Sequence, residues 1–105
     1  MLEYRISDWD DAYANGVNIA RSDRWPEAWT KPAAAFRDTL LSAGRAKLDL
    51  AYGERPRNRL DLFLPEGPAK GLVVFVHGGF WLQTDKSVWS HLAAGAVASG
   101  YAVAM

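Results

Sequence analysis

The sequence contains no cysteine, which excludes a disulfide framework and thiolate chemistry and fits a reducing cytoplasm. It also lacks any run of like charge, and its twelve basic residues offset its twelve acidic ones. We therefore expect no nucleic-acid or membrane partner. The N-terminus has neither the basic nor the apolar region of a secretory signal. The longest weakly polar stretch, 92–105, is too short to span a bilayer, so we expect a soluble, cytoplasmic protein.

Several chemical sites are also missing from the sequence. Two histidines without cysteine or His-Glu-x-x-His spacing predict no metal site, and neither glycine-rich phosphate motif occurs. We accordingly expect no metal and no cofactor. The carboxylates of Asp8, Asp10 and Asp11 fit a helix N-terminus, where they meet the positive end of the dipole, better than a ligand cluster.

The chain divides by pattern into two regions. Residues 1–46 are predicted to form a helical cap or packing segment, with one helix starting at Ser7 and ending near Asn15-Gly16. Residues 21–26 are predicted as a loop. A second helix is predicted from a Thr30 cap to Gly44. Its apolar stripe consists of Ala33, Phe36, Leu40 and Leu41.

Residues 47–105 are predicted to begin an α/β sheet. The alternating segments 48–52 and 60–64 indicate antiparallel or edge strands. The run 71–76 is apolar on both sides, which predicts a central strand buried on both faces. A helix capped by Asp85 and ended by Gly100 then leads into a further buried strand, 101–105. This order predicts a strand–helix–strand unit with parallel strands. The helix is expected to bury Val88, Leu92, Gly95, Ala96 and Ser99, or their neighbours.

One helix and an antiparallel pair would cover such a sheet poorly. We therefore expect a truncated sheet, part of a chain of roughly 250 residues, the usual scale of a large α/β domain. Alone, residues 1–105 are expected to be unstable, aggregated or a homodimer, because the last strand leaves an open edge.

The turn His77-Gly78-Gly79-Phe80-Trp81 follows the strand 71–76 and precedes the helix. This segment resembles the α/β-hydrolase superfamily, whose esterases carry an HGGG-type turn after the third strand. The His-Gly-Gly-aromatic-Trp form is similar to the kynurenine formamidase (arylformamidase) branch and its esterase neighbours.

Two readings of this turn remain open. As an oxyanion hole, it would direct the N–H groups of Gly79 and Phe80 at a developing negative charge, with each donor contributing roughly 3–4 kcal/mol. His77 and Gly78 would then shape the turn, and Phe80 and Trp81 would wall a substrate pocket. Alternatively, the glycine pair is only a strand-to-helix connection.

The resemblance implies a serine hydrolase of carboxylic esters or aryl formamides of the N-formylkynurenine type, with a small-molecule substrate. No Gly-x-Ser-x-Gly elbow occurs in this sequence, and in the superfamily the nucleophile, acid and histidine follow this turn. Ser87, Ser90 and Ser99 lack the elbow, and His91 beside Ser90 is interpreted as a coincidence. The alternative is a catalytically inert, truncated or split fragment that needs the missing sheet or a partner chain.

Aromatic residues are frequent in the first region. Trp9, Tyr13, Trp25 and Trp29 are interpreted as a packing platform against the sheet. The resemblance would also allow a lid over a substrate pocket.

Overall fold

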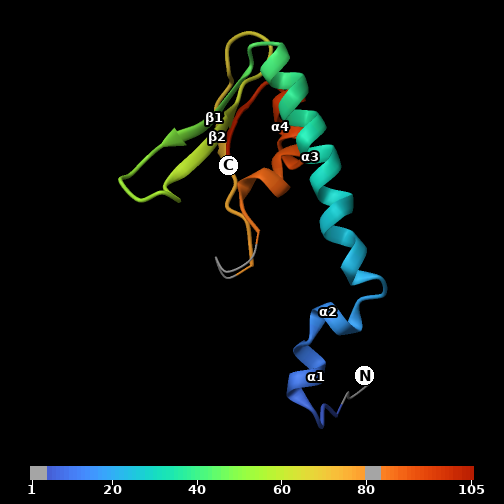
Figure 1. Cartoon of the computed structure of the whole chain (residues 1–105). Coiled ribbons are helices and arrows are strands. Elements are labelled where there is room, and N and C mark those ends of the chain that lie inside the picture. The colour runs from blue at the N-terminus through green and yellow to red at the C-terminus, as the bar shows by residue number, and fades with distance from the viewer. Residues whose placement is uncertain (1–4, 80–83) are drawn as a thin grey trace.

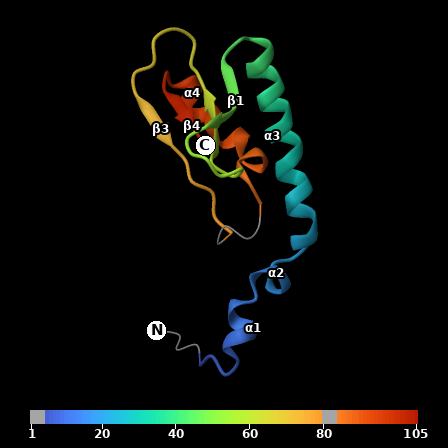
Figure 2. The same cartoon turned by 60° about the vertical axis from the view of Figure 1, so that its left-hand side comes forward.

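The computed structural model describes residues 5–79 and 84–105. In this part of the chain one long helix and a group of short turns lie against a four-stranded sheet (Figures 1 and 2). The elements are α1 (Trp9–Tyr13), α2 (Asn15–Asn18), η1 (Ser22–Arg24), α3 (Trp25–Ser42), β1 (Ala46–Ala51), β2 (Arg59–Phe63), β3 (Leu72–Val74), η2 (Lys86–Val88), η3 (Ser90–Ala93), α4 (Ala94–Ala98) and β4 (Ala102–Ala104). Within the described residues, no helix is long and apolar enough to cross a membrane.

The sheet has the order β1-β2-β4-β3 and mixes both strand directions. β1 pairs with β2 and β2 with β4 in antiparallel fashion, whereas β3 and β4 are parallel, with Val73 opposite Val103. The predicted antiparallel pair and the predicted parallel neighbours are therefore confirmed. The fold class is α/β, as the alternation of strand and helix predicted.

The prediction that 71–76 is buried on both faces is wrong for the described chain. β3 lies at one edge of this sheet, and Leu72, Val74 and Val76 are 59%, 66% and 71% exposed. The strand is apolar on both sides, but the described elements cover only one of its faces. β4, with neighbours on both sides, is buried throughout.

The core lies between the sheet and the layer formed by α3 and residues 84–98 (Figure 2). Phe63 and Val103 project from the sheet into this layer, and Leu40 and Val97 meet them from the helices. Phe36 packs edge-on against Phe63, with the ring centroids 5.1 Å apart. We call this side of the sheet the covered face, and the side that carries Leu72, Val74 and Val76 the open face.

Helix α3 begins at Trp25 rather than at the predicted Thr30, so the predicted loop is wrong at its end. Pro26 falls in the first turn, where its missing N–H costs nothing and its fixed φ favours a helix. The hydroxyl of Thr30 instead donates to the Pro26 carbonyl. The helix ends as predicted, with Gly44 in the left-handed conformation at φ 68°. Of its predicted stripe, Ala33 and Leu40 are buried, whereas Leu41 is exposed.

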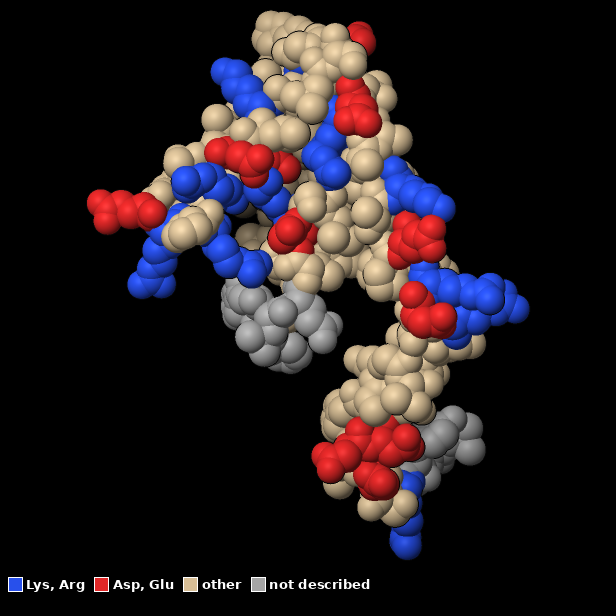
Figure 3. Space-filling model, viewed as in Figure 1, with Lys and Arg blue, Asp and Glu red and all other residues tan. Residues whose placement is uncertain are grey.

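The N-terminal helices α1 and α2 contain no buried residue and extend away from the sheet (Figure 1). The radius of gyration is consequently 17.4 Å, against about 13 Å for a compact chain of this size. Asp8, not the predicted Ser7, caps α1 by accepting from the Asp11 N–H. Asp8, Asp10 and Asp11 therefore decorate a helix N-terminus, and Figure 3 shows acidic side chains gathered there.

Residues 84–99 do not form the single predicted α-helix. They form two 3₁₀ turns and the short α4. Asp85 does act as the predicted N-cap, accepting from the Ser87 N–H at 2.7 Å, and Gly100 ends the segment at φ 92°. The buried positions of this segment are Ser90, Ala93 and Val97, whereas the predicted Leu92 is exposed.

Candidate active site

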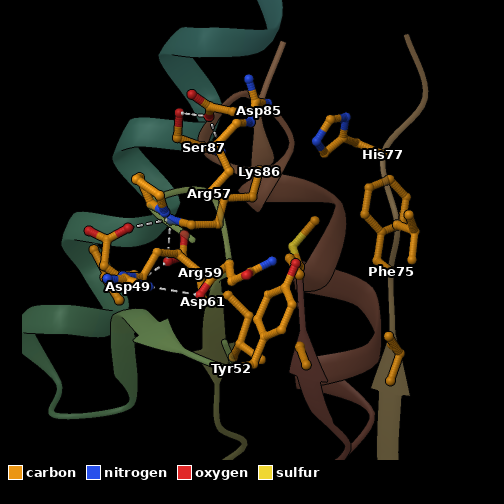
Figure 4. A pocket seen from close by; sticks show the side chains of 18 of the residues that line it. Asp49, Tyr52, Arg57, Arg59, Asp61, Phe75, His77, Asp85, Lys86 and Ser87 are labelled. Atoms are coloured by element: carbon orange, nitrogen blue, oxygen red, sulfur yellow. Dashed lines mark hydrogen bonds and ion pairs between the residues drawn. The ribbon is translucent and has the colours of Figure 1, made fainter. Parts of the chain in front are cut away.

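A cleft of about 1170 Å³ opens where β3 and β4 end at their carboxyl termini (Figure 4). Its lining comes from β1 and β2, the hairpin loop between them, the residues after β3, and residues 85–87. His77 lies on its rim directly after β3, and Met105 follows β4. In α/β sheets, ligands bind in a crevice outside the carboxyl ends of the strands. This position makes the cleft the candidate active site.

The predicted oxyanion turn begins at this cleft. The ring nitrogen Nδ1 of His77 lies 2.7 Å from the carbonyl oxygen of Gly78. Gly79 has φ 93°, a backbone conformation that side chains with a Cβ rarely adopt. Gly78 is not in that conformation, and a Cβ built on it meets no atom of the described residues within 4 Å. Phe80 and Trp81, predicted as donor and pocket wall, lie outside the described residues.

A lysine between two carboxylates occupies the middle of the cleft (Figure 4). The Nζ of Lys86 lies 2.7 Å from Oδ1 of Asp49 and 2.7 Å from Oδ1 of Asp61. The Asp61 side chain is 1% exposed and that of Lys86 18%, whereas that of Asp49 is 72% exposed. Oδ1 of Asp61 also accepts from the Asp49 N–H at 2.9 Å. We call these three residues the Lys86 cluster.

An irregularity of β1 makes this cluster possible. The register shifts between Lys47 and Leu50, and Asp49 has φ 57° within that bulge. A bulge leaves the extra residue out of the strand ladder. The N–H of Asp49 is thus available to Asp61, and its carboxylate reaches Lys86.

The charges of the cleft shift two pKa values. Desolvation is the largest influence on Lys86 and lowers its pKa, but the hydrogen bonds to Asp49 and Asp61 outweigh it and leave the pKa raised. The pKa of Asp85 is lowered, chiefly by the hydrogen bond from the Ser87 hydroxyl. Both groups are therefore held in their charged forms at neutral pH.

Ser90 and His91 do not form a catalytic pair in the structure. Ser90 is fully buried, and its hydroxyl accepts from the Arg37 guanidinium at 2.9 Å. Arg37 also donates to the Ser87 carbonyl, which ties α3 to the segment after the turn. Nδ1 of His91 is buried and has no hydrogen-bond partner among the described residues. Ser90 thus serves with Arg37 to connect two elements, and neither Ser90 nor His91 is among the described residues that line the cleft.

The tryptophans of α3 lie beside residues that follow the turn. Trp25 and Trp29 stack with centroids 6.3 Å apart, and Trp29 meets Trp89 at 4.8 Å. The Trp89 Nε1 donates to the hydroxyl of Thr84. Trp29 and Trp89 therefore pack as a platform between helix and turn segment, whereas Trp9 and Tyr13 stack only on each other and remain exposed.

Sequence reasoning missed the Lys86 cluster and Arg37. Asp61 stands at the inward position of an alternating strand, and an inward carboxylate signals a buried partner. Its partner could not be found by spacing, because Lys86 lies far along the chain. No group of acidic, histidine or cysteine side chains able to hold a metal occurs in residues 5–79 and 84–105.

Comparisons with known proteins point to one superfamily. The structure of a candidate thioesterase from Silicibacter sp. TM1040 superposes with a TM-score of 0.84 and 55% identity, over 90% of this chain and 36% of that one. The fold is therefore of the α/β-hydrolase type. No family model matches the sequence.

Curated relatives of this chain carry two names. The kynurenine formamidase of Danio rerio is 35% identical over 118 aligned positions, which cover 98% of this chain and 36% of the relative. The isoprenylcysteine α-carbonyl methylesterase of Arabidopsis thaliana is 48% identical over 50 residues, 46% of this chain and 12% of the relative. The chain thus spans little more than a third of the relatives' length at most.

Proposed function

We propose that this chain supplies the oxyanion-hole half of a serine hydrolase that cleaves carboxylic esters or aryl formamides. The observation that carries the proposal is Gly79 at φ 93°, in the segment that follows β3 and two positions after His77, which lines a cleft at the carboxyl ends of the strands. The names of the relatives support this reaction class, since all of them describe hydrolysis of an ester, thioester or formamide.

The chemistry follows from the backbone. Attack on an acyl carbon converts its carbonyl into an oxyanion, and preorganised N–H groups lower the barrier because they stabilise charge that appears only in the transition state. The proposed donors are the N–H groups of Gly79 and Phe80. A glycine at position 79 permits the turn conformation and leaves the approach of the substrate free.

The nucleophile is proposed to come from outside these residues. The sequence contains no Gly-x-Ser-x-Gly elbow, and the hydroxyl of Ser90 is engaged by Arg37. A fluorophosphonate probe should therefore label the full-length protein at a serine outside 1–105. Labelling of Ser87, Ser90 or Ser99 would contradict this part of the proposal, and no labelling at all would favour the inert-fragment alternative.

The oxyanion role is tested best by an amide-to-ester exchange at Phe80, which replaces the N–H by oxygen and keeps the side chain. In the full-length protein we expect kcat on an aryl ester or aryl formamide to fall by about 10²- to 10³-fold. The matched control is the same exchange at Leu64, whose N–H donates to the Arg45 carbonyl at 2.8 Å and which does not line the cleft. That control should cost stability and leave kcat nearly unchanged. An unchanged kcat for the Phe80 ester would overturn the proposal.

A further inference from the structure

We infer that Lys86 is a positioning residue for the oxyanion turn, held in place by its ion pairs with Asp61 and Asp49. The inference rests on the proposed function and names the device that holds its donors in register. Lys86 does not touch the acyl group in this scheme. It acts through the backbone segment that it anchors.

The described segments before and after the turn are both held by contacts with the sheet. Before the turn, β3 is fixed by its ladder with β4, which extends to the hydrogen bond from Phe75 to Ala104. After the turn, the chain is held by Lys86, whose ammonium contacts Asp61 of β2 (Figure 4). β4 lies between β2 and β3 in the sheet. The ion pair therefore ties the segment that follows the turn to β2, which is separated from β3 by β4.

The ion pair between Lys86 and Asp61 is better suited to fixing a position than to adding stability. Asp61 projects from β2 on the same side as Phe63 and is 1% exposed. Burying a carboxylate there is costly unless it is paired, and an apolar pair of similar volume is often at least as stable. Unlike an apolar contact, a hydrogen-bonded ion pair depends on direction. Oδ1 of Asp61 accepts from both the Lys86 Nζ and the Asp49 N–H, and these two hydrogen bonds fix the position of the Lys86 ammonium.

A strained residue lies next to the anchor. Thr84 has φ 65°, which is rare for a β-branched residue and persists only where the surroundings enforce it. Two side chains hold it: Trp89 donates to its hydroxyl at 3.3 Å and Arg57 to its carbonyl at 3.5 Å. With Lys86 two positions further on, the exit of the turn is fastened to the hairpin, to β2 and to its own following segment.

The competing interpretation is that the Lys86 cluster only stabilises the fold. The two roles predict different kinetics. A purely stabilising contact changes the fraction of folded enzyme and leaves the kcat of folded molecules unchanged. A positioning contact lowers the kcat of a well-folded enzyme, because displacing the donors by about 1 Å costs up to about 100-fold in rate.

The experiment uses the full-length protein with the Lys86→Met substitution, which keeps the length of the side chain and removes its charge. We expect kcat to fall by about 10- to 100-fold with KM changed by no more than about 2-fold, since the donors act on the transition state. The matched control is Lys31→Met, which removes the exposed ion pair with Glu27 in α3 and should leave both constants unchanged. Lys86→Arg, which restores the charge, should recover part of kcat. Circular dichroism and a thermal melt define the temperature at which every variant is fully folded.

The outcomes separate this inference from the proposed function. If folded Lys86→Met keeps its kcat while the Phe80 ester loses it, the anchor is merely structural and the oxyanion role stands. If the Phe80 ester keeps its kcat, the proposed function fails first. Should Lys86→Met not fold, Asp61→Asn keeps an acceptor at Oδ1 and removes the carboxylate charge. A kcat loss of about 10-fold in that variant supports the inference, and an unchanged kcat overturns it.

Discussion

The two faces of the sheet have similar sequences and different surroundings. On the covered face, Phe63 and Val103 are buried to 0% and 2% exposure. On the open face, Leu72 and Val76 are 59% and 71% exposed. Apolar side chains thus record that a face is suited to burial, and they do not tell which part of a chain covers it.

The covered face also contains the one charged side chain that is buried in the described residues. Asp61 lies on the side of Phe63 and is 1% exposed, while the exposed open face carries valine and leucine. This arrangement reverses the usual order of polar outside and apolar inside. The carboxylate is explained by its partner Lys86, and its position by the cleft that both residues line.

The largest effect expected from this comparison is the loss of an aromatic side chain on the covered face. Phe63→Ala should lower the free energy of unfolding by about 3–5 kcal/mol, because it leaves a cavity against Phe36 and Leu40. Leu72→Ala on the open face should cost under about 1 kcal/mol. Urea denaturation of both variants measures the difference. Equal losses would mean that the two faces are equally covered in the protein.

The second effect concerns the charge on the covered face. At neutral pH Lys86→Met should destabilise by about 3 kcal/mol, because it leaves the Asp61 carboxylate buried without its counter-ion. The folded pKa of Lys86 is raised above its usual 10.5, so its contribution is complete below that pH and is lost as the pH rises through the folded pKa. Denaturation curves between pH 7 and the alkaline limit test this. A difference between wild type and variant that grows with pH would contradict the assignment.

A smaller loss of stability is expected at a helix cap, and it depends on whether the capped segment packs on the covered face. Asp85→Ala removes the cap of the segment above the covered face and should cost about 1 kcal/mol. The pKa of Asp85 is lowered in the fold, so this contribution is present above its usual 3.8 and is lost as the pH falls through the folded pKa.

The matched control for Asp85 is Asp8→Ala at the cap of α1. That helix contains no buried residue, and its local unfolding should leave the global transition unchanged. A global destabilisation by Asp8→Ala as large as that by Asp85→Ala would show that α1 contributes to the core.

The smallest change in stability, under about 0.5 kcal/mol, is expected for Val74→Thr combined with Val76→Thr on the open face. The effect should appear in association instead. The sequence predicted an open edge at the last strand, which is wrong for the described chain, because β4 lies between β2 and β3 and it is β3 that forms an edge of the sheet. Residues 1–105 alone are therefore expected to dimerise or aggregate through the exposed apolar surface on β3. Size-exclusion chromatography with light scattering should show more monomer for the double variant. A monomeric wild-type chain would refute the expectation.

Sequence patterns predicted the strands better than the helix boundaries. The apolar runs around Val73 and Val103 predicted a parallel pair, and Gly44 and Gly100 marked two ends, because these signals are local. The start of α3 was wrong because Trp25-Pro26 fits both a loop and a first helical turn, and packing decides between them. The 3₁₀ turns after Asp85 could not be predicted, since they follow from contacts with α3 such as that of Arg37 with Ser90.

The same distinction applies to the site. The turn at Gly79 could be recognised because its residues are adjacent in the sequence and one of them needs a positive φ. The Lys86 cluster could not, because three distant segments meet in it and one of them is irregular. Sequence spacing can identify a site whose residues are adjacent in the chain, whereas a site formed by distant segments is identified only from the folded structure.

The bulge at Asp49 changes which face of the sheet the following residues of β1 point to. Leu48 and Leu50 have the same parity, and in a regular strand both would point the same way. Here Leu48 packs on the core and Leu50, opposite Leu60, belongs to the open face. Deleting Asp49 would restore a regular ladder. It would also remove the N–H that donates to Asp61 and the carboxylate that accepts from Lys86. A deletion that improves the pairing of the strands would therefore remove one of the two carboxylates that hold Lys86, so alignments of distant relatives should treat a gap at this position as a change in the site and not as loop variation.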